Sequence, residues 1–238
     1  MVCPEIFTEE DQPMTLQIAM VGKDGFVLAS DTKATKNMSV LPTGRRQIGQ
    51  TFKTTKIRQR REGGLICAHS GSDEAGQLAE VFVINAPAEF VDDQAVADYL
   101  IGWSSGATNM ANQLVIVVVT KAKPGMHKLW RVYFTGQNPP PFVQWVDDRL
   151  TGGDEGNAAL YFGERYYDPS KTVDDLALLA AHVILEGHVA NPTGVEGLEV
   201  WIGRNGEEPE QLDLGKLDRL KTRSAAVHDS VKSQFISH

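Results

Sequence analysis

The sequence has 238 residues, of which 23 are Lys or Arg and 31 are Asp or Glu, so its formal net charge is -8. This length fits one large domain or two small ones, and a hydrophobic fraction of 42% with 23% charged residues excludes a wholly disordered chain. The acidic balance argues against a nucleic-acid partner, because proteins that bind nucleic acids need a basic surface.

The chain carries no signal for a membrane, for secretion or for a metal. Its longest apolar run, residues 114–119, is far shorter than the ~18 residues of a membrane helix. The leading segment 1–13 contains acids but no Lys or Arg, unlike a secretory signal. The two cysteines, Cys3 and Cys67, cannot form a disulfide framework, and two thiols make a poor metal site. We therefore expect a cytoplasmic protein with no membrane partner, no metal and no cofactor.

The first third of the chain predicts strands that pair as hairpins. Apolar and polar residues alternate over 16–20, which is typical of a strand with one buried face. Asp24-Gly25 favours a tight turn into a second strand over 26–30. Weaker strand character follows near 52–57, and a short buried strand is expected at 65–68.

Helical spacing begins after this strand. The apolar residues of 75–82 recur every three or four positions, and Ser72 fits the N-cap. A second helix is expected over about 92–112, interrupted or bent near Ser104-Ser105-Gly106. The rest of the chain then predicts strands, two helices, a hairpin and a final helix: strand 114–120, strand 129–135, a short strand around 143–146, a helix from about 157 to 168, a helix over 172–189, a hairpin of 198–202 with 211–212, and a helix over 216–235.

The strands occur mostly as hairpins, so the sheets should be antiparallel. Pairs of helices stand twice between hairpin groups, which suggests two stacked sheets with helix layers outside them. We see no internal linker and no repeat after the leading segment. The sequence therefore predicts an α+β fold in one domain.

Most common site motifs are absent from the sequence, which has no His-Glu-x-x-His, no paired CxxC and no P-loop, and whose six histidines are scattered. One segment, residues 45–61, is basic within an acidic chain. It is either an anion-binding edge or a solvated hairpin whose charges discourage edge-to-edge pairing. We favour the solvated hairpin for every basic residue of the segment except Lys56.

The segment 15–35, TLQIAMVGKDGFVLASDTKAT, resembles the start of a mature proteasome β-type subunit, a member of the N-terminal nucleophile (Ntn) hydrolases. In that family a Thr heads the first strand, and the second strand ends in Ala-x-Asp-x-(Arg/Lys)-Ala-Thr. Asp31 stands at the family's spacing from Thr15. Lys56 before an apolar residue, and LICAHSGSDEA at 65–75, resemble the next two motifs, although the loop before Lys56 is longer. Beyond these motifs the similarity rests on the order of elements.

The resemblance implies a threonine protease or amidohydrolase. Thr15, once it is the N-terminal residue, would attack an amide carbonyl through its hydroxyl. Its own α-amine would be the base, directly or through a water. Lys56 would lower the pKa of that amine and help to remove the hydroxyl proton, while Asp31 keeps Lys56 charged and oriented. The Gly71 N–H would stabilise the oxyanion, and Thr35 would hydrogen-bond an extended substrate backbone.

The resemblance also implies an architecture and partners. The family fold is a four-layer αββα sandwich of two antiparallel sheets, here a single domain over 15–238. The expected substrate is a peptide or another amide, and the chain is expected to form a homo-oligomer, either a dimer or a ring.

Three positions depart from the family pattern. Met14 stands where self-processing members have Gly before the nucleophile. The family's Asp-x-x-Ser loop, which supports the nucleophile's amine, is Asn191-Pro-Thr193-Gly here, so Asn191 and Thr193 are candidates to replace the missing acid in part. The family's Gly-Ser-Gly is Gly-Gly-Asp154, which makes Asp154 the candidate to replace the serine.

Residues 1–14 therefore allow three interpretations. They are a propeptide, or a mis-called extension before a chain that starts at Met14 and loses it, or a segment that stays attached. The first two give an active threonine hydrolase, or a ligase if an amine intercepts the acyl-enzyme. The third gives a catalytically silent scaffold or interaction subunit on the same fold.

Overall fold

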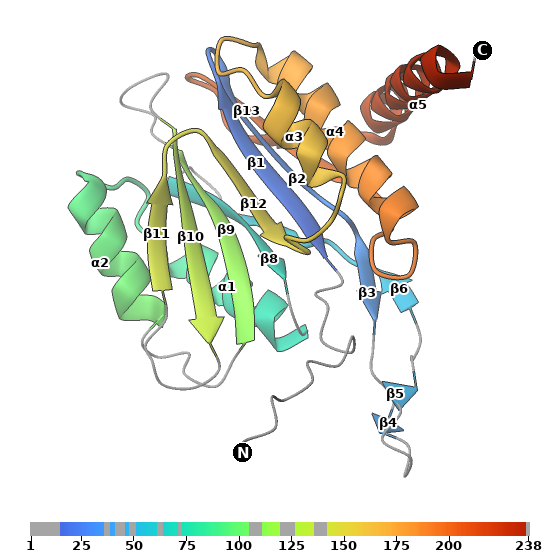
Figure 1. Cartoon of the computed structure of the whole chain (residues 1–238). Coiled ribbons are helices and arrows are strands. Elements are labelled where there is room, and N and C mark those ends of the chain that lie inside the picture. The colour runs from blue at the N-terminus through green and yellow to red at the C-terminus, as the bar shows by residue number, and fades with distance from the viewer. Residues whose placement is uncertain are drawn as a thin grey trace, which may run out of the picture.

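The computed structural model of the chain (Figure 1) describes residues 15–35, 39–40, 46–47, 51–60, 64–70, 73–104, 111–119, 127–135 and 142–236. Among these residues, every helix is too short or too polar to cross a membrane.

One five-stranded antiparallel sheet, the first sheet, has the strand order β12-β1-β2-β13-β14. The predicted hairpin at its centre is confirmed, because β1 and β2 pair with Gln17 opposite Ser30. On the other side of β1 lies β12, with Leu16 opposite Gly153. The strands are β1 (Leu16–Gly22), β2 (Gly25–Ser30), β12 (Arg149–Gly153), β13 (Glu199–Arg204) and β14 (Glu210–Gln211).

The second five-stranded sheet is also antiparallel and has the order β11-β10-β9-β8-β7. Its central strand, residues 111–119, is rich in β-branched residues, as expected of a strand that is covered on both faces. Its strands are β7 (Ile57–Gln59), β8 (Gly64–Ser70), β9 (Ala111–Val119), β10 (Lys128–Thr135) and β11 (Phe142–Val146).

Each sheet has its own helices. The helices α3 (Leu160–Tyr166), α4 (Val173–Ala190) and α5 (Leu214–Ile236) accompany the first sheet. They share one apolar core with β1, β2 and β13. The helices α1 (Asp73–Asn85) and α2 (Asp93–Ser104) accompany the second sheet and share a core with β8 and β10. Figure 1 shows the two groups of helices on opposite sides of the molecule.

A third apolar cluster joins the two sheets. It combines side chains of β1, β2 and β12 with side chains of β7, β8 and β10, and all of them are buried. Because neither sheet leaves this face to water, the cluster fixes the position of one sheet against the other. Its residues are Ala19, Phe26, Leu28, Ile57, Ile66, Ala68, Leu129 and Leu150. The predicted α+β class with antiparallel sheets is confirmed.

The structure differs from the expected elements at two places. The helix expected over 92–112 ends at Ser104, and Ala111 already belongs to β9. The β-branched run from 114 continues the strand backwards into this polar stretch through its pairing with β10. No strand was expected at 149–153; pairing with β1 makes this segment the edge strand β12.

The weak strand expected near 52–57 is in fact two short strands. The first, β6 (Thr51–Lys53), pairs with β3 (Lys33–Thr35) in a separate two-stranded sheet. The second is β7, in the second sheet. Lys56 falls in the connection between β6 and β7, so it lies outside both strands and not within the single strand that was expected. A further two-stranded sheet pairs β4 (Ser39–Val40) with β5 (Arg46–Gln47).

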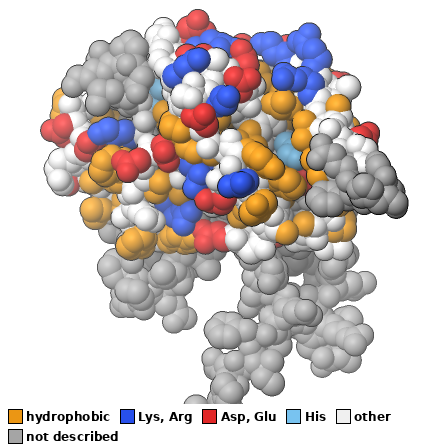
Figure 2. All heavy atoms as spheres, turned by 45° about the horizontal axis from the view of Figure 1, so that its top comes forward, with side chains coloured by type: hydrophobic (Ala, Val, Ile, Leu, Met, Phe, Trp, Pro, Cys, Tyr) orange, Lys and Arg blue, Asp and Glu red, His pale blue; other side chains and the backbone are white. Residues whose placement is uncertain are grey.

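Figure 2 shows one face of the molecule with acidic and basic side chains interspersed among hydrophobic ones.

Candidate active site

Thr15 lies directly before β1 and is buried, with 6% of its surface exposed. Its carbonyl oxygen accepts a hydrogen bond from the Asp154 backbone N–H at 2.7 Å. Gly153 makes this approach possible, since it has a φ of 83° and a Cβ there would lie 1.9 Å from the Thr15 oxygen. The backbone of Thr15 is therefore held by the end of β12.

Asp31 follows the last residue of β2 and is completely buried. The backbone N–H of Leu16 donates to Oδ1 at 2.9 Å, and the backbone N–H of Lys33 donates to Oδ2 at 3.0 Å. Two main-chain donors thus orient the carboxylate toward the start of β1, where Thr15 lies.

Lys56 reaches both residues from the connection between β6 and β7. Its Nζ lies 2.8 Å from Thr15 Oγ1, 3.0 Å from Asp31 Oδ1 and 2.9 Å from Asp31 Oδ2. Only 4% of Lys56 is exposed. The three residues that the sequence proposed as a catalytic group therefore meet around one buried ammonium.

Burial moves the pKa of both charged partners toward neutrality. It lowers the pKa of Lys56 from its ordinary value, and the charge and hydrogen bonds of Asp31 oppose that change. It raises the pKa of Asp31, against the Lys56 ammonium and the two backbone N–H donors. Lys56 is therefore less basic than an exposed lysine, and this is the condition under which a lysine can exchange a proton near neutral pH.

The other predicted site residues are only partly described. Thr35 is the last residue of β3, but its side chain lies outside the described residues. Gly71 lies outside them as well, directly after β8, and so does the segment 1–14. Their roles stay predictions.

A polar network next to Thr15 joins two of the residues at which the sequence departs from the family pattern. Asp154 Oδ2 accepts hydrogen bonds from Asn157 Nδ2 at 3.1 Å and from Asn191 Nδ2 at 3.3 Å. Asn191 in turn accepts from the Thr193 hydroxyl at 3.1 Å. Asp154 is buried and also donates its backbone N–H to the Thr15 carbonyl, so the residue that replaces the family's serine is joined to the backbone of the candidate nucleophile.

His69, near the end of β8, is a second buried titratable group beside Lys56. Its backbone N–H donates to the Lys56 carbonyl at 3.0 Å. Burial, with the charges of Arg58 and Lys56, lowers the pKa of His69 from 6.5 to about 4. The imidazole is therefore neutral at physiological pH.

This pKa predicts a dependence of stability on pH. Between pH 6.5 and 4 the unfolded chain binds a proton at His69 that the folded chain does not bind, so the free energy of unfolding rises with pH. The contribution is fully present above pH 6.5 and is lost as the pH falls to about 4, a loss of roughly 3 kcal/mol. Urea titrations of the wild type and of His69→Gln at several pH values measure it. The slope in this window should be shallower in the variant; equal slopes would show that His69 does not titrate there.

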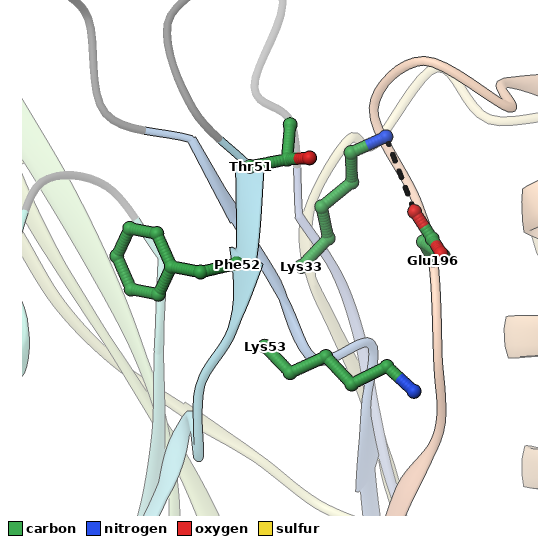
Figure 3. Close-up of a pocket in the computed structure, with 5 residues that line it drawn as sticks. All are labelled: Lys33, Thr51, Phe52, Lys53 and Glu196. Atoms are coloured by element: carbon green, nitrogen blue, oxygen red, sulfur yellow. Dashed lines mark ion pairs between the residues drawn. The ribbon is translucent and has the colours of Figure 1, made fainter.

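A pocket of about 260 Å³ lies beside the β3–β6 pair (Figure 3). The Lys33 ammonium faces the Glu196 carboxylate across it, with Nζ 3.6 Å from Oε2. Lys33 and Lys53 are direct cross-strand neighbours in the β3–β6 pair. The residues that line the pocket are Lys33, Thr51, Phe52, Lys53 and Glu196. None of the three residues around the buried ammonium is among them.

The comparisons with known proteins identify the fold. No protein-family model and no curated protein matches the sequence. Among solved structures, an Anbu (Gly-1) mutant from Hyphomicrobium sp. strain MC1 aligns with a TM-score of 0.67 and 14% identity over 93% of this chain and 96% of that one. Anbu, an ancestral beta-subunit, from Yersinia bercovieri aligns at 0.66 and 12% over 92% and 96%. Another Anbu structure from Hyphomicrobium sp. strain MC1 gives 0.66 and 14% over 92% and 96%.

The chain has the fold of Anbu. The predicted resemblance is thereby confirmed as far as the fold, since the chain aligns with a solved ancestral beta-subunit over more than nine-tenths of its length. At 12–14% identity the likeness extends no further than the fold. Any activity must therefore be argued from the site itself.

Proposed function

We propose that this chain is a threonine hydrolase that cleaves peptides or other amides after Thr15 has become its N-terminal residue. The observation that carries the proposal is the position of Lys56 Nζ, within 3.0 Å of both Thr15 Oγ1 and the Asp31 carboxylate. A buried lysine between a hydroxyl and a carboxylate is the arrangement that an activated nucleophile needs.

The proposed reaction is an acyl transfer. Thr15 Oγ1 attacks the amide carbonyl carbon, and its proton passes to the free α-amine of Thr15, directly or through a water. An α-amine titrates near ~7.7–8.0, and the neighbouring Lys56 ammonium lowers that pKa further. The departing amine then takes up a proton as the C–N bond breaks, which leaves an ester on Thr15. Water hydrolyses this ester and releases the acid.

Other residues support the same reaction in this proposal. The Gly71 N–H stabilises the oxyanion of the tetrahedral intermediate. Thr35 hydrogen-bonds the substrate backbone, and the substrate adds to the sheet edge as an extra strand. Asp154 takes the place of the acid that the family carries on the loop around Asn191. Asp154 is buried, and the hydrogen bond from its backbone N–H to the Thr15 carbonyl keeps the two residues together.

We further infer the finer architecture that accompanies this function. The two sheets and their helix groups form the four-layer αββα sandwich of Ntn hydrolases, with residues 15–238 as one domain. The chain acts in the cytoplasm as a homo-oligomer, a dimer or a ring.

The proposal is tested by the N-terminus of the protein purified from its native host. Intact mass and N-terminal sequencing should show a chain that begins at Thr15. Incubation with a β-lactone or an epoxyketone should then add one inhibitor mass at that residue. A chain that keeps residues before Thr15 and does not react would instead favour the scaffold function, since the amine in the mechanism would be tied up in a peptide bond.

A further inference from the structure

Glu199 is a buried carboxylate that the reaction above does not use. It is the first residue of β13, and 2% of it is exposed. Its Oε2 accepts a hydrogen bond from the Lys56 backbone N–H at 3.0 Å. Its Oε1 accepts from Trp201 Nε1 and from Gln211 Nε2, each at 3.1 Å. All three partners donate, so the arrangement fits an ionised carboxylate, which can only accept.

With the Glu199 contact, both backbone polar groups and the side-chain ammonium of Lys56 are hydrogen-bonded. The Lys56 carbonyl accepts from the His69 backbone N–H of β8, and its backbone N–H donates to Glu199 of β13. Its Nζ contacts Asp31 and Thr15. Lys56 is therefore held by both sheets, although it lies in a connection that belongs to neither. Its backbone N–H depends on the Glu199 side chain for this hydrogen bond.

Stability alone is a poor explanation for an acid at this position. Removing a carboxylate from water costs several kcal/mol, which is recovered only with a good counter-charge. The three donors that bind Glu199 are all uncharged groups. Burial accordingly raises the pKa of Glu199, and hydrogen bonds with the charge of Arg58 oppose that change. A costly buried charge next to a candidate catalytic lysine is more typical of a functional site than of a core.

We propose that Glu199 is a positioning residue for Lys56: it fixes the Lys56 backbone and, through its negative charge, helps to keep the side chain in the ammonium form. Its charge acts on Lys56 in the same direction as that of Asp31. This role rests on the proposed function, in which the ammonium lowers the pKa of the Thr15 amine. The other charged or titratable groups that face Lys56 or Glu199 are Asp31, Lys33, Arg58 and His69.

The first test measures Lys56 without any activity. The Lys56 pKa is followed by NMR of the full chain labelled with ¹³C at lysine Cε, and its signal is assigned by its loss in Lys56→Met. Glu199→Gln removes the charge and should lower the Lys56 pKa. Glu196→Gln is the matched control, because it removes an exposed carboxylate that pairs with Lys33 instead. Equal Lys56 pKa values in the wild type and in Glu199→Gln would overturn the charge role.

The second test uses the rate at which a β-lactone acylates Thr15, as a function of pH. In Glu199→Gln the rate should fall about tenfold or more, the usual effect of losing a hydrogen bond to a charged group. The alkaline limb, where the ammonium is lost, should move to lower pH. A lower melting temperature with unchanged pH limbs would reduce Glu199 to a structural residue.

A second variant separates the charge of Glu199 from its hydrogen bonds. Gln211 is exposed, so Gln211→Ala should leave the fold intact while it removes one uncharged donor from Glu199. Glu199 keeps its charge in this variant, so the Lys56 pKa should stay at its wild-type value, and a fall as large as that in Glu199→Gln would count against the charge role. If the wild type is not acylated at all, the proposed hydrolase function fails, whereas the NMR measurement still decides the role of Glu199.

Discussion

Replacing Thr15 by Ala should abolish acylation by a β-lactone and all amide cleavage. The variant loses Oγ1, which is the only atom in the proposed mechanism that bonds to substrate. Removal of a nucleophile costs about 10³-fold or more in rate. Lys56 keeps its two bonds to Asp31, so the free energy of unfolding should change by only about 1 kcal/mol. Inhibitor labelling followed by mass spectrometry, with a thermal melt, measures both effects.

Thr15→Ser is the matched control for this variant. It keeps the hydroxyl and loses one methyl group, so it should still be labelled at its N-terminal residue while the Ala variant is not. The intact mass of the Ala variant carries a second result. If residues 1–14 are removed by Thr15 itself, they should stay attached in the Ala variant; if Met14 is removed by an aminopeptidase, both chains begin at position 15. Equal labelling of the Ala variant and the wild type would contradict the assignment of Thr15.

The parts of the fold that the sequence predicted well are those set by local pattern. The β1–β2 hairpin follows from alternation and from one Asp-Gly turn, and α4 follows from helical spacing after Thr172. The strand β12 could not be predicted this way. Two of its five residues are glycines, and it is a strand because Leu16 and its neighbours supply the hydrogen bonds. Long-range pairing of this kind leaves no periodicity in the sequence.

In the candidate site, too, the sequence predicted the local motifs but not the long-range contacts. Thr15, Asp31 and Lys56 came from a resemblance to family motifs, and nothing in their spacing shows that the three side chains meet. Their meeting depends on Lys56 lying between two sheets, in a connection that was expected to be part of a strand. The pattern also gave no sign of Glu199, since one acid at the head of a strand looks like a solvent-facing residue until β13 is placed beside β2.

The loops that carry Asp154 and Asn191 change the interpretation of the missing acid at 191. The missing acid at Asn191 counted against activity when each loop was considered separately. In the structure Asn191 and Asp154 are hydrogen-bonded to each other, and Asp154 also binds the Thr15 backbone. The acid therefore stands at 154, where the family has a serine, and an amide stands at 191, where the family has the acid, with the two side chains hydrogen-bonded to each other.

Replacing Asp31 by Asn should lower both the stability and the reactivity of the protein. An amide at this position replaces one carboxylate oxygen by an NH2 group, which faces Lys56 Nζ and one of the two backbone donors, and it leaves the buried ammonium without its counter-ion. Breaking a buried ion pair from one side costs about 3–5 kcal/mol. Acylation of Thr15 should fall by about 10²-fold or more, because an unpaired Lys56 loses both its charge and its orientation. Chemical denaturation and inhibitor labelling measure the two losses.

Adding Lys56→Met to Asp31→Asn separates the two losses. A buried ion pair that is replaced by uncharged side chains of similar size often costs little stability, so the double variant should recover most of the free energy of unfolding that Asp31→Asn loses. It should not recover acylation, because no ammonium remains beside Thr15. Together with the wild type and the single variant Lys56→Met, these two variants complete a double-mutant cycle. The coupling energy from that cycle measures the interaction between Asp31 and Lys56. Recovery of both quantities would show that the pair contributes only to the core, and loss of neither in Asp31→Asn would remove Asp31 from the site. Stability that returns without acylation therefore marks the Lys56–Asp31 ion pair as catalytic and not merely structural.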